Sequence, residues 1–162
     1  MTKFFIVIIG LLSLYSCKKQ RYECLRNFTE DKLACEATNV SDTLNGVYVS
    51  YYANGIKKSE GNYVSGIPTG YWTFYYENGN VMKEGSFSNG TIQGVWKTYY
   101  ESGNIESEGA YQSCDRTGFW KFYFDLSSHQ IQFEGDSEND LKTGIWKEYR
   151  GNGEVEEEFH CS

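Results

Sequence analysis

The chain has 162 residues, of which 17% are aromatic, 17 are glycine and a single one is proline. This length suits one domain, and this composition favours β structure over disorder. The formal net charge of −7 argues against nucleic acid or an anionic lipid surface as the partner of the folded body.

The N-terminal sixteen residues have the features of a bacterial lipoprotein signal peptide. Lys3 precedes an apolar run over residues 4–15, which is too short to span a bilayer but suits a signal-peptide core. The tetrapeptide Leu-Tyr-Ser-Cys at residues 14–17 resembles a lipobox, which implies cleavage before Cys17 and lipid attachment to its thiol. We therefore expect residues 1–16 to be removed and the mature chain to be anchored in the cell envelope, at the outer rather than the inner membrane. An ordinary signal peptide followed by an incidental cysteine is the alternative.

Residues 17–45 lack the pattern of the later chain and would form a polar tether with a short N-terminal segment. A short helix is predicted over residues 29–35, because Thr29 can serve as its N-cap and acidic residues in the first turn favour the helix dipole.

Four cysteines remain if Cys17 carries lipid, and an oxidising compartment favours disulfides among them. They are Cys24, Cys35, Cys114 and Cys161. We favour a bridge between Cys24 and Cys35, and we leave open whether Cys114 pairs with Cys161.

From Gly46 onward the sequence repeats with a period of 24 residues, lengthened to 26 once by a two-residue insertion. The glycines that open the units are Gly46, Gly70, Gly94, Gly118 and Gly144. A fixed period of this length indicates a repeat array. The expected units, which follow without linkers, are residues 46–69, 70–93, 94–117, 118–143 and 144–162.

Each unit is predicted to be a β-hairpin, because a run rich in Trp, Tyr and β-branched residues leads into a turn sequence and a second strand-like run. Asn-Gly pairs predict two-residue turns in which both residues adopt positive φ. These pairs are Asn54-Gly55, Asn78-Gly79 and Asn152-Gly153. The resulting register places the tryptophan of a unit opposite the glycine of its Glu-Gly pair, where the indole would cover bare backbone. The expected pairs are Trp72 with Gly85, Trp96 with Gly109, and Trp120 with Gly135.

The expected fold is therefore all-β: an elongated antiparallel meander of about ten strands, two per repeat. One face would carry an aromatic column as the core, formed by Tyr48, Trp72, Trp96, Trp120 and Trp146, with Tyr52, Tyr76, Tyr100 and Phe124 beside it. The other face would pair Lys97 with Glu108, Lys121 with Glu134, and Lys147 with Glu158. Such cross-strand ion pairs contribute roughly 0.2–1 kcal/mol each. A single-layer sheet cannot hide two aromatic faces, so some rings should remain exposed as an interaction surface.

The pattern G-x-W-x-x-Y-Y-x-x-G followed by E-G-x-[YF] resembles the MORN-repeat variant family, including bacterial YwqK-type proteins described as antitoxins. The resemblance covers residues 46–161, with Tyr48 in place of Trp, a long turn at residues 127–130, Arg150 in the last unit, and Phe159 in place of Gly. Atypical end units are what a stacked array needs as caps. The resemblance implies a protein-binding module that neutralises a toxin. An anchored member would act in the envelope, as an immunity protein does against an incoming effector.

No pattern in the chain points to catalysis or to a bound cofactor. His129 and His160 fall in no ligand or base motif, and there is no phosphate loop, nucleophile elbow or metal-ligand spacing. A column of acids could suggest the carboxylate pair of a glycosidase; it consists of Glu60, Glu84, Glu108, Glu134 and Glu158. Equivalent positions in successive hairpins lie about 9.6 Å apart, however, and most of these acids face a lysine. We interpret the column as a solvated charge ladder.

The sequence thus predicts a non-catalytic envelope lipoprotein whose repeat surface binds another macromolecule, in the first place a protein. The acidic balance favours a basic partner through electrostatic steering. A glycan- or wall-binding module that uses exposed aromatic rings is the alternative.

Overall fold

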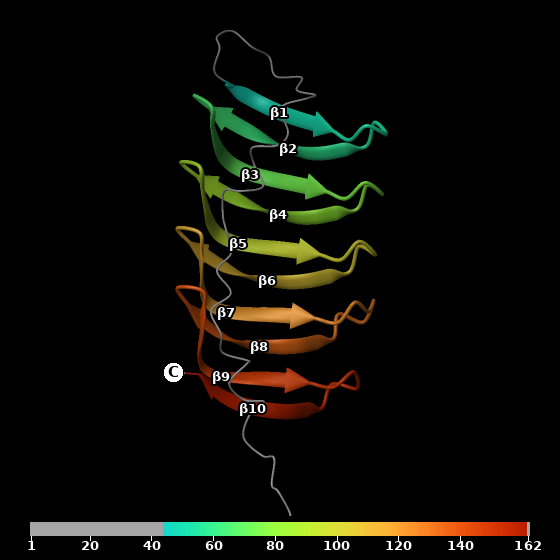
Figure 1. The fold of residues 1–162 in the computed structure, drawn as a ribbon, viewed down its shortest axis with the longest axis vertical. Helices are drawn as coiled ribbons and strands as arrows, with labels where there is room; N and C mark the ends of the chain where they lie inside the picture. Colours follow the sequence, from blue (N-terminus) through green and yellow to red (C-terminus); the bar gives the residue numbers. More distant parts are fainter. Residues whose placement is uncertain (1–43, 162) are drawn as a thin grey trace, which may run out of the picture.

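The computed structural model describes residues 44–161, which form one elongated ten-stranded antiparallel sheet (Figure 1). Each strand pairs with its neighbours in sequence, so the sheet is a simple meander. The predicted all-β meander is confirmed, and the helix expected at residues 29–35 lies outside the described residues. The strands are β1 (Gly46–Tyr51), β2 (Lys57–Val64), β3 (Ile67–Tyr75), β4 (Val81–Ser88), β5 (Thr91–Tyr99), β6 (Ile105–Gln112), β7 (Asp115–Tyr123), β8 (Ile131–Glu138), β9 (Leu141–Tyr149) and β10 (Val155–Cys161).

The turns within the hairpins differ from the expected two-residue type. In the β3–β4 turn the N–H of Tyr76 donates to the carbonyl of Asn80 at 2.8 Å, and the N–H of Gly79 donates to the carbonyl of Tyr76 at 2.9 Å. These bonds enclose a three-residue loop in which Gly79, with φ of 91°, takes the left-handed position. Asn78 has no positive φ; its side-chain oxygen accepts the N–H of Asn80 at 2.9 Å. The prediction that both residues of the Asn-Gly pair adopt positive φ was therefore wrong.

The predicted register is nevertheless confirmed, because a bulge compensates for the longer turn. Tyr75 pairs with Val81, whereas Phe74 pairs with Lys83, so Met82 is an extra residue on β4. This one-residue shift restores the alignment that a two-residue turn would set. Trp72 lies opposite Gly85, Trp96 opposite Gly109, and Trp120 opposite Gly135.

Two-residue turns occur instead between one hairpin and the next. Both residues of each such turn have positive φ: Ser65-Gly66 (51°, 77°), Asn89-Gly90 (49°, 78°), Ser113-Cys114 (52°, 74°) and Asn139-Asp140 (50°, 65°). This backbone twist matches the twist of the flanking strands, as in type I′ turns. In the last two turns, Cys114 and Asp140 take the position that glycine takes in the first two.

Each indole covers a glycine, but that glycine belongs to the preceding hairpin. A Cβ added to Gly61 would lie 2.2 Å from the Trp72 ring, and one added to Gly109 would lie 2.2 Å from the Trp120 ring. The same relation holds for Gly85 with Trp96 and Gly135 with Trp146. The expectation that an indole covers the glycine of its own hairpin is corrected: these contacts join successive hairpins.

An irregularity at the start of β3 explains this placement. Glu60 pairs with Thr73 and Asn62 pairs with Thr69, so three residues of β3 face one residue of β2. Gly70, with φ of 69°, lies in this bulge and has open space where a side chain would be. Glycine accepts this backbone conformation at little steric cost, which accounts for the glycine that opens each unit.

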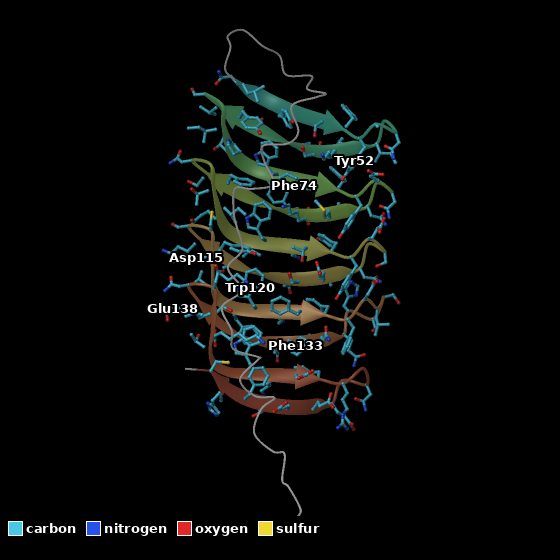
Figure 2. The ribbon with its side chains drawn as sticks, viewed as in Figure 1. Tyr52, Phe74, Asp115, Trp120, Phe133 and Glu138 are labelled. Atoms are coloured by element: carbon cyan, nitrogen blue, oxygen red, sulfur yellow. The ribbon has the colours of Figure 1, made fainter. Side chains whose placement is uncertain are left out.

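The aromatic column is the core of the sheet. Its members are each at most 6% exposed: Tyr48, Trp72, Trp96, Trp120 and Trp146. The core forms two clusters, one from Tyr48 to Trp96 and one from Trp120 to Cys161, and Tyr111 packs against both. Between them Thr98 Oγ1 and Ser107 Oγ are hydrogen-bonded at 2.7 Å. Figure 2 shows Phe74, Trp120 and Phe133 following one another along the long axis of the sheet.

A cation replaces one ring of this core. Rings pack edge-on against the tryptophans at Tyr63, Phe87 and Tyr111, but the equivalent position in β8 is Ser137. Its cross-strand neighbour Lys142 places Nζ 4.3 Å from the centroid of the Trp146 ring. Burial lowers the pKa of Lys142. The cation–π contact covers the ring that Ser137 leaves bare.

Candidate interaction surface

An apolar stripe runs along the face opposite the tryptophans. The residue before each member of the aromatic column is apolar and about half exposed: Val47 (64%), Tyr71 (56%), Val95 (65%), Phe119 (51%) and Ile145 (47%). Successive side chains of a strand point to opposite faces, so these five residues share the face that the tryptophans leave. We call them the outer stripe. The outer stripe was not among the predicted features, although each unit has an apolar residue directly after its opening glycine.

Two members of the outer stripe lie opposite short side chains. Tyr71 pairs with Ser86, and Val95 pairs with Ala110. The other three pair with larger polar residues: Val47 with Asn62, Phe119 with Asp136 and Ile145 with His160. Tyr71 and Val95 are therefore longer than the residues paired with them within the hairpin.

A row of alternating charge crosses the strands beside the outer stripe. The lysines of one hairpin face glutamates on both sides, as Lys97 pairs with Glu84 and Glu108, and Lys147 pairs with Glu134 and Glu158. The predicted ion pairs form between Lys97 and Glu108 at 3.5 Å and between Lys147 and Glu158 at 3.4 Å. For Lys121 the register opposite Glu134 is confirmed. Because these side chains are exposed, each pair contributes about 0–1 kcal/mol.

Tyrosine hydroxyls connect the acid column from hairpin to hairpin. Each donates to the glutamate of the preceding hairpin: Tyr75 to Glu60, Tyr99 to Glu84 (2.6 Å), Tyr123 to Glu108 (2.7 Å) and Tyr149 to Glu134 (2.5 Å). Burial raises the pKa of Tyr75 to about 12, and the hydrogen bond to Glu60 acts in the same direction. Hydrogen bonds from Lys57 and Tyr75 lower the pKa of Glu60. Four of the five acids are therefore built into a structural ladder and are not simply solvated.

A second ladder follows the edge where the hairpins turn. Each hydroxyl donates to a backbone carbonyl of the next hairpin. Tyr52 donates to the carbonyl of Tyr75 at 2.6 Å, Tyr76 to the carbonyl of Tyr99 at 2.7 Å, and Tyr100 to the carbonyl of Tyr123 at 2.8 Å. Tyr52, Tyr76 and Tyr100 follow the ends of β1, β3 and β5. They were expected beside the tryptophan column, but they tie neighbouring hairpins together at the turn edge.

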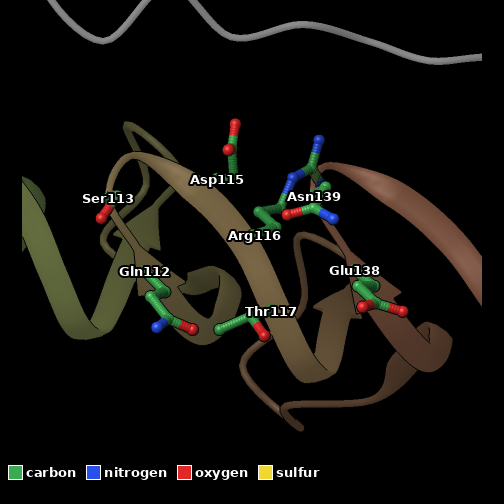
Figure 3. Close-up of a pocket in the computed structure, with 7 residues that line it drawn as sticks. All are labelled: Gln112, Ser113, Asp115, Arg116, Thr117, Glu138 and Asn139. Carbon is green, nitrogen blue, oxygen red and sulfur yellow. The ribbon is translucent and has the colours of Figure 1, made fainter.

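A polar pocket of about 320 Å³ lies between the β6–β7 and β8–β9 turns (Figure 3). It is lined by Gln112, Ser113, Asp115, Arg116, Thr117, Glu138 and Asn139. Beside it the Asp140 carboxylate accepts the backbone N–H of Arg116 at 2.8 Å and lies 3.9 Å from the Arg116 Nε. Within residues 44–161, no three His, Cys, Asp or Glu side chains are grouped so as to hold a metal ion. His129 lies in the β7–β8 turn, and His160 pairs with Ile145.

The cysteines do not form the bridge that was left open. Cys161 is disulfide-bonded, whereas Cys114 is a thiol, so the two are not joined. Cys17, Cys24 and Cys35, together with the expected signal peptide, lie outside the described residues.

Comparison with protein families matches three segments of the chain to the MORN repeat variant: residues 44–65, 68–89 and 92–113. These segments span β1 to β6. No curated protein matches the chain. The strands after residue 113 keep the same register and indole–glycine contacts, but a count of five repeats remains a prediction. No helix in the described part is long and apolar enough to cross a membrane.

Proposed function

We propose that this chain is a non-catalytic, lipid-anchored envelope protein whose repeat sheet binds another protein. The outer stripe is the observation that carries the proposal. Its members are 47–65% exposed and recur in every hairpin, and an apolar surface of this extent usually marks an interaction site. MORN repeats generally mediate protein or membrane binding, which is consistent with a scaffold that presents one sheet face.

The resemblance to YwqK-type proteins supports a more specific role, the neutralisation of a protein toxin. With Cys17 lipidated, the chain would act in the envelope, at the outer membrane, as an immunity protein against an incoming effector. The formal charge of −7 favours a basic partner, whose association is accelerated by steering.

Glycan binding is the second candidate, because the aromatic residues Tyr71 and Phe119 are about half exposed. These two rings are separated by Val95 in the outer stripe and stand four strand spacings apart, about 19 Å. A sugar chain stacking on neighbouring rings would need them closer. The interruption by aliphatic side chains therefore favours a protein partner.

The proposal is tested by crosslinking in intact cells, followed by capture of the full chain from detergent-solubilised membranes at low and high salt. We expect a protein partner that is recovered less well at high salt, because screening weakens steering. Cys17→Ala should move the chain from the membrane to the soluble fraction. Absence of a protein partner, together with saturable glycan binding that Tyr71→Ala and Phe119→Ala remove, would favour the glycan alternative.

A further inference from the structure

We propose that the outer stripe binds an extended, basic segment of the partner in the polyproline II conformation, lying across the strands with an apolar side chain at every third residue. This inference rests on the proposed function and names the chemistry of the partner. It follows from the spacing, relief and charge of the outer stripe.

The spacing of the outer stripe matches one turn of polyproline II. Equivalent residues of successive hairpins are two strands apart, which is about 9.6 Å at a strand spacing near 4.8 Å. A polyproline II helix has three residues per turn and rises about 3.1 Å per residue, so every third side chain recurs on one side after about 9.3 Å. The mismatch is roughly 0.3 Å per hairpin, or about 1 Å over the whole stripe.

Other regular conformations fit the spacing less well. An α-helix repeats its face after seven residues, about 10.5 Å, so the mismatch would reach roughly 4 Å over four steps. A β-strand advances about 10 Å in three residues, but its third residue points to the opposite side. Polyproline II therefore combines the required distance with a constant direction.

The relief of the surface provides places for the side chains of the segment. Ser86 pairs with Tyr71 on one side and with Gln93 on the other, and Ala110 pairs with Val95 on one side and with Thr117 on the other. An apolar side chain of the partner can lie over each of these short residues and contact the member of the outer stripe paired with it. Ser86 and Ala110 are one hairpin apart, so one regular segment can contact both in succession.

The charged row beside the outer stripe indicates which residues of the partner segment would lie next to its apolar side chains. The neighbouring row contains Glu84, Glu108, Glu134 and Glu158, against Lys97, Lys121 and Lys147. Asp136, which pairs with Phe119 on β7 and with Thr143 on β9, adds a carboxylate beside the outer stripe. This excess of acid, within a chain of net charge −7, fits lysine or arginine at the positions of the segment that face the row.

Peptide binding by the purified full-length chain, followed by fluorescence anisotropy, tests the inference. The probe is a synthetic peptide of about five Pro-Lys-Leu units, which favours polyproline II and places leucine at every third residue. One control has the same composition but an irregular leucine spacing, and another has glutamate in place of lysine. We expect saturable binding of the probe and at least about tenfold weaker binding of both controls.

Matched variants locate the binding. Val95→Glu and Phe119→Glu should each weaken binding of the probe by about tenfold or more. Val155→Glu introduces the same charge at a 48%-exposed valine of β10, outside the outer stripe, and should leave binding unchanged. Circular dichroism confirms that each variant keeps its sheet.

Equal binding of the regular and irregular peptides would overturn the inference, as would insensitivity to Val95→Glu. Flotation with phosphatidylcholine vesicles that Val95→Glu abolishes, without peptide binding, would assign the outer stripe to lipid instead. Photo-crosslinkers at positions 95 and 155 separate the two proposals. A protein crosslinked in cells only from position 155 would leave the proposed function standing and reject this site, and a protein crosslinked from neither would count against both.

Discussion

Gly109 shows that the packing of this sheet requires a residue without a Cβ at this position. A Cβ at this position would lie 2.2 Å from the Trp120 ring, and that ring is 2% exposed with its Nε1 donating to the carbonyl of Ala110 at 3.2 Å. We expect Gly109→Ala to displace the indole and to lower the free energy of unfolding by about 1–3 kcal/mol.

Urea denaturation measures this loss. Gly151→Ala is the matched control, because nothing lies within 4 Å of its Cβ position and its φ is not positive. The control should change the free energy of unfolding by no more than about 0.5 kcal/mol. A Gly109→Ala variant as stable as wild type would show that the indole does not need the bare glycine.

The hydroxyl of Tyr75 stabilises the contact between the first two hairpins in a pH-dependent way. Its folded pKa of about 12 lies above the ordinary value of 10, so its contribution is complete below pH 10 and is lost as the pH rises to about 12. Glu60 has a lowered pKa, so its contribution is lost on acidification below the ordinary value of 4.5.

Tyr75→Phe should therefore lower the free energy of unfolding at neutral pH by about 1–2 kcal/mol, because Glu60 loses a hydrogen-bond donor. The difference from wild type should shrink above pH 10. Tyr51→Phe, which alters a 40%-exposed ring, is the control and should have little effect. A difference that stayed constant from pH 7 to pH 12 would refute the role of the hydroxyl.

At the scale of the hairpin, the sheet should tolerate loss of one whole unit. Deleting residues 70–93 joins Thr69 to Gly94 and brings Trp96 over Gly61, which repeats the native contact between Trp72 and Gly61. Tyr99 would likewise replace Tyr75 as the donor to Glu60. We expect a folded β protein with a lower melting temperature, because stability in an array rises with the number of stacked units.

Circular dichroism and thermal unfolding measure this result. Deletion of residues 70–81 is the control: it removes the part of β3 that carries Trp72 and only the first residue of β4. This half-unit deletion reverses the direction of every later strand relative to β1 and β2, so the turns and the indole–glycine pairs no longer match, and it should prevent folding. If the two deletions behaved alike, the 24-residue unit would not be the unit of packing.

At the scale of the whole molecule, β10 protects one end of the sheet against further growth. Glu156, Glu157 and Glu158 are exposed on this edge strand, and charged edges discourage pairing with another chain. Phe159 occupies the place of the glycine that would lie under a following indole. Replacement of the three glutamates by threonine should therefore promote concentration-dependent self-association, even though the ion pairs of Glu156 and Glu158 that it removes are weak.

Sedimentation velocity over a range of concentrations detects such association. The matched control replaces Glu77, Glu101 and Glu138 by threonine, which removes equal charge from exposed positions away from β10. That variant should sediment as wild type does. Association of both variants to the same extent would mean that net charge, and not the edge, keeps the chains apart.

The sequence alone determined the strand order, the register within each hairpin and the members of the buried column. These features depend on neighbours close in the chain: the 24-residue period, the alternation of side chains and the turn residues. The outer stripe could also have been predicted from the sequence, because Val47, Val95 and Ile145 occupy the same position of the 24-residue period.

Only the tertiary structure decided how the hairpins join. The bulge at Gly70 shifts β3 against β2 and thereby brings Trp72 over Gly61 instead of Gly85. The same offset brings Tyr75 to Glu60. These contacts depend on pairing between hairpins, whose alignment is set by backbone conformation at a glycine and by packing across the whole sheet, and neither is encoded in a local pattern of residue types.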